Sequence, residues 1–406
     1  MYDSLLKIYH SDISNYNKLY ESRFNSDFAI HLNFNIRNNQ AFFIETPELM
    51  KKIISINKID KNIWTLVDYL PRASITQFTK RCLIDEIVLS NKIEGVHSTR
   101  KEIDSLLADL EKHNTKKRFK GLVSKYKKLM ENETIPIDEA KDIRDIYNEL
   151  VLDEVVENDS KNRPDGILFR KESVSVVSPT GKEIHTGVCP ENKIIEAMNN
   201  AIDVLKNEDI IDLFRISIFH YLFGYIHPFY DGNGRTSRFI SSYLLSRCLE
   251  PLIGYRISYT IQENIKEYYE AFKICNDPRN KGDLTPFIYM FVDIIHTSMV
   301  QLEKALSSRK FALDRYLSAF TILTENDKKV WKLYNYLVQV TLFAEYGFST
   351  KELMDITNES RNTVAKRLNV LQNCGILIEK KIGNEKFFTL DLEVVDKIIL
   401  DNEQVD

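Results

Sequence analysis

The stretch HPFYDGNGR, residues 227–235, joins two segments that carry apolar residues at helical spacing. The segment before it, residues 211–226 (IDLFRISIFHYLFGYI), is apolar almost all round, which predicts a buried helix. Pro228 disfavours an α conformation at His227, so we expect this helix to end about there. Phe229 is apolar between polar neighbours and is expected to anchor the loop in the core. From Gly234 the pattern is helical again, so the polar residues gather in a loop between two helices.

The loop carries residue types suited to acid–base chemistry beside a metal ion. His227 lies where a helix ends, near the negative end of the helix dipole, which is expected to make its imidazole more basic. Such a histidine can act as a general base if it is neutral near the working pH. Asp231 offers hard oxygen ligands suited to Mg²⁺ that bridges phosphates.

The residues that open the second helix are suited to binding an anion. Gly232 and Gly234 permit a tight turn and bring backbone N–H groups close to a ligand at a helix N-terminus. Arg235 and Arg238 are three apart, hence on one helix face, and both can contact phosphate oxygens. A capped helix–turn–helix with surface charges would explain a glycine in the turn. It would not explain a histidine, an aspartate, an asparagine and two arginines together, so we favour a phosphate-binding site.

Extended to HPFYDGNGRTSR, residues 227–238, the motif resembles the signature of the Fic (filamentation induced by cAMP) family. Members of that family typically transfer AMP from ATP to a protein hydroxyl. The resemblance implies that His227 takes the proton from a Ser, Thr or Tyr hydroxyl, whose oxygen attacks the α-phosphorus of ATP while pyrophosphate leaves. It also implies that Asp231 holds Mg²⁺. The nucleotide-binding residues that it implies are Asp231, Gly232, Asn233, Gly234, Arg235, Thr236, Ser237 and Arg238.

The resemblance distinguishes the phosphate contacts further. Asn233 would lie on the α-phosphate, Arg235 on the β-phosphate and Arg238 on the γ-phosphate. Kinases of the Doc type have lysine in place of the second glycine, so Gly234 disfavours phosphorylation as the reaction.

A second motif, SNKIEG at residues 90–95, lies before the core motif. Ser90 and Glu94 are four apart and share one helical face. The motif resembles the inhibitory helix of Fic proteins, in which Glu94 would pair with Arg238 and push the γ-phosphate of ATP out of its productive position. The alternative is a helix that ends in an exposed glutamate before a glycine C-cap. Glu94 also leaves open the reverse reaction, because some family members use this glutamate to orient a water that removes AMP from a modified protein.

Two further regions resemble parts of a Fic site. Residues 173–188 read as a β-hairpin at the position of the family's flap, which pairs with the target segment, although a purely structural hairpin is the alternative. The helix that carries residues 267–276 resembles the adenine side, although tyrosines on an amphipathic helix more often belong to the core. The residues concerned are Val174, Ser175, Val176 and Val177 in the flap, and Tyr268, Tyr269 and Asn276 on the helix.

The C-terminal tail has a different pattern. A short helix capped at Ser349 and a second helix over residues 360–373 precede two strands joined at Gly383-Asn384, which resembles a winged helix-turn-helix. Basic residues on the second helix are suited to DNA, but acidic residues surround them, and winged helices also dock proteins.

Composition restricts the setting of the protein. The formal net charge of −4 and pI near 6.1 give no global basic field for nucleic acid or anionic membranes. The start of the chain does not read as a signal peptide, and no apolar run reaches membrane-spanning length. Five scattered cysteines indicate neither a disulfide framework nor a zinc site. We expect a cytoplasmic protein, and the richness in Lys, Asn and Ile suggests a bacterial one.

These observations predict a mainly α protein with a helical N-terminal region (1–130), a Fic core with a β-hairpin flap (131–305), a connecting helix (306–330) and a winged-helix domain (331–406). The predicted function is a protein adenylyltransferase that uses ATP and Mg²⁺ and is autoinhibited by Glu94. The alternatives are de-AMPylation through Glu94 and a nucleotide-sensing, DNA-binding transcription regulator. The target protein is open, with self-modification and a homodimer among the options, and no membrane partner is expected.

Overall fold

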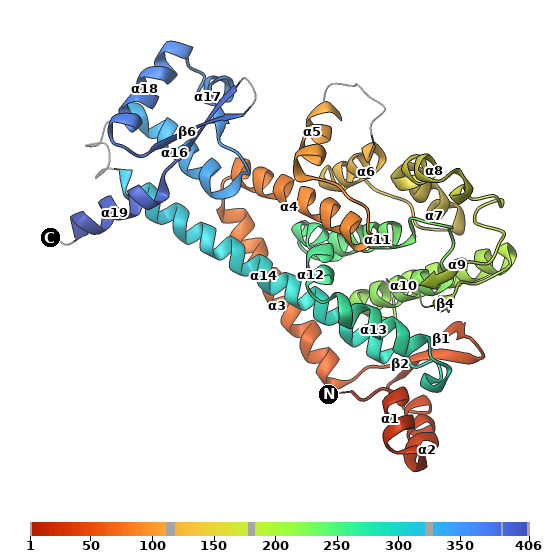
Figure 1. Cartoon of the computed structure of the whole chain (residues 1–406). Helices are drawn as coiled ribbons and strands as arrows, with labels where there is room; N and C mark the ends of the chain where they lie inside the picture. Colours follow the sequence, from red (N-terminus) through yellow and green to blue (C-terminus); the bar gives the residue numbers. More distant parts are fainter. Residues whose placement is uncertain (1, 111–117, 178–182, 321–327, 383–384, 404–406) are drawn as a thin grey trace. The chain divides into compact units, whose positions relative to one another are not determined.

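The chain is mainly α-helical, as the sequence predicts (Figure 1). The computed structural model describes residues 2–110, 118–177, 183–320, 328–382 and 385–403. The chain divides into two compact units, of which the first comprises Met1–Lys61 with Cys82–Val300 and the second Asn62–Arg81 with Gln301–Asp406. No helix in the described part of the chain is both long enough and apolar enough to cross a bilayer. The domain boundaries predicted above stay predictions.

The N-terminal part of the first unit contains a β-hairpin that the sequence prediction omits. Its elements are α1 (Leu5–Ser11), α2 (Ile13–Phe24), β1 (Ala29–Ile36), β2 (Asn39–Ile44) and the start of α3 (Pro47–Tyr69). β1 and β2 pair antiparallel. The signal was present in the sequence, because the buried residues Leu32, Phe34 and Ile36 alternate with asparagines. From the sequence we expect helical signals to begin near Ile63, but α3 begins earlier, at Pro47.

A series of helices leads from the N-terminal part to the flap. They are α4 (Arg72–Ile93), α5 (Arg100–Leu110), α6 (Lys120–Met130), α7 (Ala140–Tyr147), the π-helical η1 (Asn148–Leu152), α8 (Asp153–Asn158) and the short η2 (Ser160–Asn162). A reciprocal capping box between Glu139 and Asp142 starts α7. The turn around η1 widens to a π-helix without interrupting the helical run from Ala140 to Asn158.

The predicted hairpin is present before the buried helix. Strands β3 (Ser175–Val177) and β4 (Glu183–Thr186) pair antiparallel, while the predicted Pro179-Thr180-Gly181 turn lies outside the described residues. The rest of the first unit consists of α9 (Glu191–Lys206), α10 (Asp212–Ile226), α11 (Asn233–Cys248), η3 (Pro251–Tyr255), α12 (Ile257–Glu263), α13 (Ile265–Asn276), η4 (Pro278–Asn280) and the start of α14 (Thr285–Ser318).

Helix α10 forms the centre of the first unit. Nearly all its side chains are buried, as its all-round apolar sequence predicts, and it packs against α9 and α11 (Figure 1). The loop between α10 and α11 is therefore held at the end of a rigid core element.

The second unit contains the helices and strands expected for the tail. Beyond the parts of α3, α4 and α14 that it includes, its elements are α16 (Lys328–Phe343), β5 (Phe348–Ser349), α17 (Thr350–Thr357), α18 (Arg361–Asn373), β6 (Leu377–Ile382), β7 (Glu385–Leu390) and α19 (Leu392–Glu403). The three strands form an antiparallel sheet in the order β5-β7-β6. Ser349 and Glu352 form the capping box that the sequence predicts. The winged-helix assignment itself stays a prediction.

Candidate active site

His227 ends α10 in a left-handed backbone conformation, with φ of 51°. Its N–H still donates to the carbonyl of Phe223 at 2.9 Å, so the residue closes the last turn of the helix. A non-glycine residue at positive φ is strained, and such strain persists only where the surrounding structure enforces it. The carbonyl of His227 accepts a hydrogen bond from Nε of Arg170 at 2.9 Å, which supplies part of that constraint.

The imidazole of His227 is held in its neutral form. Burial and the positive charge of Arg170 lower its pKa to about 4, while the carboxylate of Glu94 acts in the opposite direction. The sequence led us to expect a more basic histidine, but desolvation and the neighbouring cation lower its pKa instead. A neutral imidazole near pH 7 can accept a proton.

The loop after His227 is fastened by Phe229 and Asn233. The buried ring of Phe229 stacks on Tyr147 with 3.6 Å between centroids, as expected for a loop anchor. The side-chain amide of Asn233 accepts from Phe229 N–H at 3.0 Å and donates to Phe229 C=O at 2.8 Å. This amide is therefore engaged within the loop, and the expected contact of Asn233 with the α-phosphate stays a prediction.

The loop turns at Gly232, whose φ of 80° suits glycine and where a Cβ would lie 2.9 Å from Val151 Cγ2. Asp231 accepts a hydrogen bond from the N–H of Gly232 at 2.5 Å and is partly exposed. Among the described residues no group of three His, Cys, Asp or Glu side chains is arranged to hold a metal. Mg²⁺ at a nucleotide commonly uses one or two carboxylates together with phosphates and water, so Asp231 fits that mode.

The N-terminus of α11 is open. No side chain caps it, and the N–H groups of the first turn of a helix have no acceptor within the helix. Arg235 is fully buried on this turn and forms an ion pair with Glu154 of α8. Its Nε and Nη2 have no hydrogen-bond partner among the described residues. An anion at this end of α11 would meet backbone donors, the helix dipole and unpaired guanidinium N–H groups.

Arg238 has all three of its nitrogens engaged with the second motif. Nη1 donates to Glu94 Oε1 at 2.8 Å, while Nε and Nη2 donate to Ser90 Oγ at 3.0 Å and to Ser90 C=O at 2.8 Å. Ser90 is fully buried near the end of α4, whereas the side chain of Glu94, just beyond the helix, is 26% exposed. The pairing of Glu94 with Arg238 that the motif predicts is therefore formed.

Gly234 is part of the same contact. A Cβ at this position would overlap Glu94 Oε1 and lie 2.7 Å from Glu94 Cδ. Because Gly234 is helical and not at positive φ, its lack of a side chain matters for space and not for backbone conformation.

The side chains of Thr236 and Ser237, predicted to bind nucleotide, support the helix in this structure. Thr236 Oγ1 donates to the carbonyl of Gly232 at 2.9 Å. Ser237 Oγ lies 3.1 Å from Nδ1 of His220, whose Nε2 lies 2.7 Å from the hydroxyl of Tyr268. Burial lowers the pKa of His220 to about 3, so it is a neutral, hydrogen-bonded core histidine, and Tyr268 faces it.

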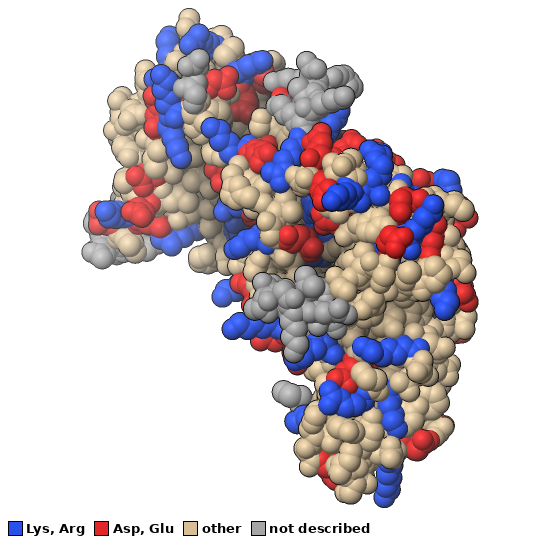
Figure 2. Space-filling model, turned by 45° about the vertical axis from the view of Figure 1, so that its right-hand side comes forward, with Lys and Arg blue, Asp and Glu red and all other residues tan. Residues whose placement is uncertain are grey.

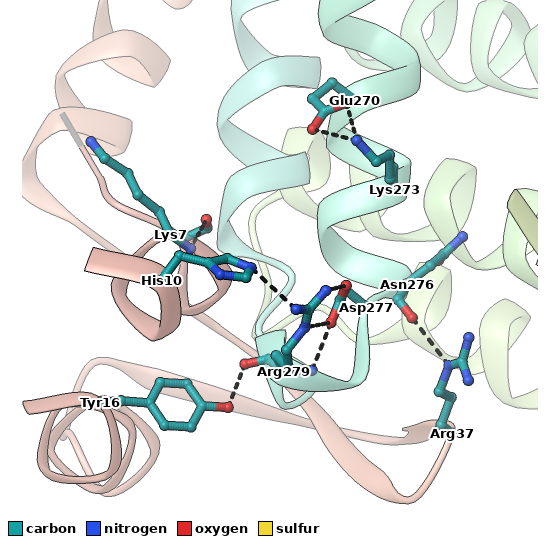
Figure 3. Close-up of polar contacts among 10 residues, drawn as sticks. Lys7, His10, Tyr16, Arg37, Glu270, Lys273, Asn276, Asp277 and Arg279 are labelled. Carbon is teal, nitrogen blue, oxygen red and sulfur yellow. Dashed lines mark hydrogen bonds and ion pairs between the residues drawn. The ribbon is translucent and has the colours of Figure 1, made fainter. Parts of the chain in front are cut away.

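The other residues expected on the adenine side lie differently. Tyr269 is 36% exposed. Burial is the main cause that raises the pKa of its hydroxyl, and the negative charge of Glu94 adds to the effect. Tyr269 therefore lies beside the Glu94–Arg238 pair. Asn276 is buried at the end of α13, where its Oδ1 accepts from the hydroxyl of Tyr221 at 2.7 Å. Figure 3 shows the backbone carbonyl of Asn276 accepting from Arg37. The side-chain oxygen of Asn276 therefore already accepts a hydrogen bond within the protein.

The base of the hairpin β3–β4 is hydrogen-bonded to the end of α10, next to the 227–235 loop. Gly187 N–H donates to Val174 C=O at 2.9 Å, and Val188 N–H donates to Ile226 C=O at 3.0 Å. Ser175 pairs with Thr186 in the ladder, and Val176 and Val177 follow in the same strand. The chain that leaves the hairpin therefore lies beside the end of α10, and the role of the hairpin as a flap stays a prediction.

Two buried charged residues of the site were not predicted. Glu154 holds Arg235, and Arg170 contacts His227. Neither has a local sequence signal, because Glu154 lies in an acidic segment and Arg170 follows an unremarkable apolar stretch. Only the tertiary structure brings them to the motif.

Comparisons with known proteins bear on the family of this region and on the fold of the chain. The profile of the Fic/DOC family matches residues 136–245. A crystal structure of a Fic family protein from Desulfovibrio desulfuricans has a similar fold, with a TM-score of 0.50 at 18% identity over 85% of this chain and 96% of that one. The chain therefore contains a domain of the Fic/DOC family.

Curated relatives match shorter stretches. The protein adenylyltransferase fic-1 of Caenorhabditis elegans is 28% identical over 137 residues, which are 33% of this chain and 24% of that protein. The protein adenylyltransferase Fic of Drosophila grimshawi is 38% identical over 74 residues, which are 18% of this chain and 14% of that protein. The chain thus matches about a quarter or less of the length of these relatives.

Proposed function

We propose that this protein is a protein adenylyltransferase, which transfers AMP from ATP to a Ser, Thr or Tyr hydroxyl of a target protein. The observation that carries the proposal is the juxtaposition of two features at one loop. A neutral imidazole at His227 ends one helix, and the next helix opens with an uncapped N-terminus and unpaired donors on Arg235. The first feature suits a base, and the second suits a polyphosphate.

In this reaction each residue has a separate task. His227 accepts the proton of the target hydroxyl, whose oxygen forms a bond to the α-phosphorus as the bond to pyrophosphate breaks. The N–H groups at the start of α11 and the free N–H groups of Arg235 neutralise charge on the phosphates. Mg²⁺, held by Asp231, would supply further charge neutralisation.

We further propose that Glu94 inhibits transfer by occupying Arg238. Every nitrogen of the Arg238 guanidinium already donates to Glu94 or Ser90. A γ-phosphate that needs Arg238 must therefore displace the carboxylate. Loss of Glu94 frees Nη1 while Ser90 continues to hold the other two nitrogens.

The test is transfer of label from α-³²P-ATP with Mg²⁺ to protein, with a bacterial lysate as a source of targets. Four proteins are compared: wild type, Glu94→Gly, His227→Ala in the Glu94→Gly background, and Glu133→Gly. Glu133 is an exposed loop glutamate and serves as the matched control. We expect strong labelling only with Glu94→Gly, and wild-type levels with Glu133→Gly. If Glu94→Gly binds ATP yet labels neither itself nor any lysate protein, the proposal is wrong.

A second candidate function concerns the tail, which we propose binds double-stranded DNA. Residues 361–390, which comprise α18 and the following hairpin, contain six Lys or Arg and two Asp or Glu. Helix α18 has no acidic residue, and its exposed positions include Arg361, Asn362, Lys366 and Asn369. Figure 2 shows basic side chains over the top of this unit, where α17 and α18 lie. Arginine and asparagine are residue types that read base edges, and lysine neutralises phosphates.

DNA binding is tested by fluorescence anisotropy with a pool of random duplexes at 50 and 200 mM salt. The double variant Arg361→Ala/Lys366→Ala is compared with Lys304→Ala/Lys397→Ala, which removes the same charge from exposed positions of α14 and α19. We expect wild-type affinity to fall about tenfold or more with this rise in salt. The α18 variant should bind more weakly at both salt concentrations and the control unchanged. Equal loss in both variants would show that α18 is not the binding surface.

A further inference from the structure

Arg170 is a buried cation that binds backbone carbonyls. Its side chain is fully buried in the segment just before the hairpin, and among the described residues it forms no ion pair with Asp or Glu. Nε donates to His227 C=O at 2.9 Å, Nη1 to Glu172 C=O at 2.5 Å, and Nη2 to Val188 C=O at 2.8 Å. A buried arginine retains its charge, so carbonyl dipoles must replace the hydration that it has lost.

These carbonyls come from three parts of the site. Those of Ile226 and His227 lie at the end of α10, where Nη2 of Arg170 also reaches Ile226 C=O at 3.5 Å. Val188 follows β4, and Glu172 precedes β3. One guanidinium therefore connects the base-carrying residue with both ends of the hairpin.

The surrounding backbone leaves space for this guanidinium. A Cβ on Gly187 would overlap Arg170 Nη2 and would lie 3.1 Å from His227 Cβ. The backbone N–H of Arg170 also donates to Pro228 C=O at 3.2 Å, on the far side of His227. The residue thus contacts the chain on both sides of a strained, left-handed histidine.

We propose that Arg170 is a positioning residue for His227, which fixes the direction of the imidazole and ties it to the base of the hairpin β3–β4. The proposal rests on the function proposed above, in which His227 is the base and the hairpin aligns the target. A lysine could retain the positive charge but could not contact carbonyls in three directions with a rigid planar fork. The charge and the geometry can therefore be separated by substitution.

The electrostatic consequence is a histidine that resists protonation. The charged and titratable groups that face His227 are Arg170, His185 of β4 and Glu94. Arg170 and His185 disfavour a second positive charge, and Glu94 favours it. Removal of the Arg170 charge should therefore raise the pKa of His227.

The experiment is an NMR titration of ¹⁵N-labelled histidine in the full chain, with the His227 signal assigned by its loss in His227→Ala. The variants are Arg170→Gln, Arg170→Lys and the control Arg144→Gln. Arg144 also donates to a backbone carbonyl, that of Leu168, but has no contact with His227. We expect a midpoint near pH 4 in wild type, Arg170→Lys and Arg144→Gln, and a midpoint about one pH unit higher in Arg170→Gln.

Kinetics in the Glu94→Gly background complete the test. Both Arg170 variants should lower kcat about tenfold or more with an unchanged KM for ATP, whereas Arg144→Gln should change neither. Thermal unfolding measures the folded fraction of each variant. The inference is overturned if Arg170→Gln leaves the His227 midpoint where Arg144→Gln leaves it, or if kcat falls only with the folded fraction. If no variant transfers AMP, the proposed function fails, and the titration still decides whether Arg170 controls the imidazole.

Discussion

Arg238 Nη1 donates to Glu94 Oε1 at 2.8 Å, although the two residues are 144 positions apart in the sequence. The contact brings the turn after α4 onto the first turns of α11. Gly234 makes it sterically feasible, because any side chain there would occupy the space of the Glu94 carboxylate. This contact therefore joins the motif proposed to bind phosphate to the residue proposed to inhibit it.

Gly234 and Glu94 should be energetically coupled. Gly234→Ala should destabilise the wild-type chain, because the new methyl group displaces the Glu94 carboxylate from Arg238. In the Glu94→Gly background the same substitution should cost less, because only Arg238 Nη1, 2.9 Å from the new Cβ, would still have to move and the gain in helix propensity opposes that cost. A double-mutant cycle measured by chemical unfolding tests this. Identical effects of Gly234→Ala in the two backgrounds would contradict the coupling.

Asn233 should matter for stability through the loop. Asn233→Ala removes both hydrogen bonds to the backbone of Phe229 and should cost about 1–3 kcal/mol of unfolding free energy, because buried backbone groups lose their partners. Asn233→Asp keeps the acceptor but loses the donor, and should also destabilise the chain. Urea unfolding checks both values. If either variant weakens ATP binding without lowering stability, the side chain contacts nucleotide instead.

Removal of Glu154 should leave a buried cation without its partner. Glu154 is buried against the fully buried Arg235. Glu154→Ala is therefore expected to lower the free energy of unfolding by about 3–5 kcal/mol. Asp138→Ala is the control, because the Asp138 side chain is 77% exposed and lies 4.0 Å from Lys206. Its loss should cost less than about 1 kcal/mol. Similar losses for the two variants would show that Arg235 does not depend on Glu154.

Glu86 of α4 should make stability fall as pH rises. Burial raises the pKa of this carboxyl to about 7, although hydrogen bonds from Ser258 and the charges of Arg238 and Arg256 oppose the shift. The folded state therefore binds the proton more tightly than the unfolded state, whose pKa is near 4.5. The contribution of Glu86 to the free energy of unfolding is fully present below pH 4.5 and is lost as pH rises through about 7.

Glu86→Gln removes this dependence. The variant should gain stability relative to wild type between pH 5 and pH 8, by at most about 3 kcal/mol. Urea unfolding at pH 5, 6, 7 and 8 measures the difference, with Glu133→Gln as an exposed control. A difference between Glu86→Gln and wild type that does not change with pH would mean that Glu86 is ionised throughout this range.

Several local features could be predicted because they depend on neighbours in the sequence. The all-round apolar pattern of residues 211–226 predicted α10, and the Ser349–Glu352 spacing predicted a capping box. The hairpin β3–β4 was likewise predicted from two short strands. The hairpin β1–β2 was missed although Leu32, Phe34 and Ile36 alternate with asparagines, since the mixed pattern around it obscured the signal.

Other features depend on residues far apart in the chain and had no local signal. The ionisation of His227 follows from its burial and from Arg170, and the partner of Arg235 is Glu154 of a different helix. The side-chain amide of Asn233 is hydrogen-bonded to the backbone of Phe229. Oδ1 of Asn276 accepts a hydrogen bond from the hydroxyl of Tyr221. Residue spacing alone does not reveal either contact. Desolvation and hydrogen-bond competition are properties of the packed state, so only the tertiary structure decides them.

The sequence by itself determined the motif and elements such as α10 and the hairpin β3–β4, because helical periodicity, turn residues and caps act over a few positions. The motif resemblance also indicated that Glu94 would meet Arg238. Only the tertiary structure decided which hydrogen-bond partners and which charge states the side chains of the site have. Nε and Nη2 of Arg235 have no hydrogen-bond partner among the described residues. All three guanidinium nitrogens of Arg238, in contrast, donate hydrogen bonds. His227 is neutral beside a buried cation. Charge and hydrogen-bond capacity in a desolvated site depend on every neighbour in space, and those neighbours come from distant segments of the chain.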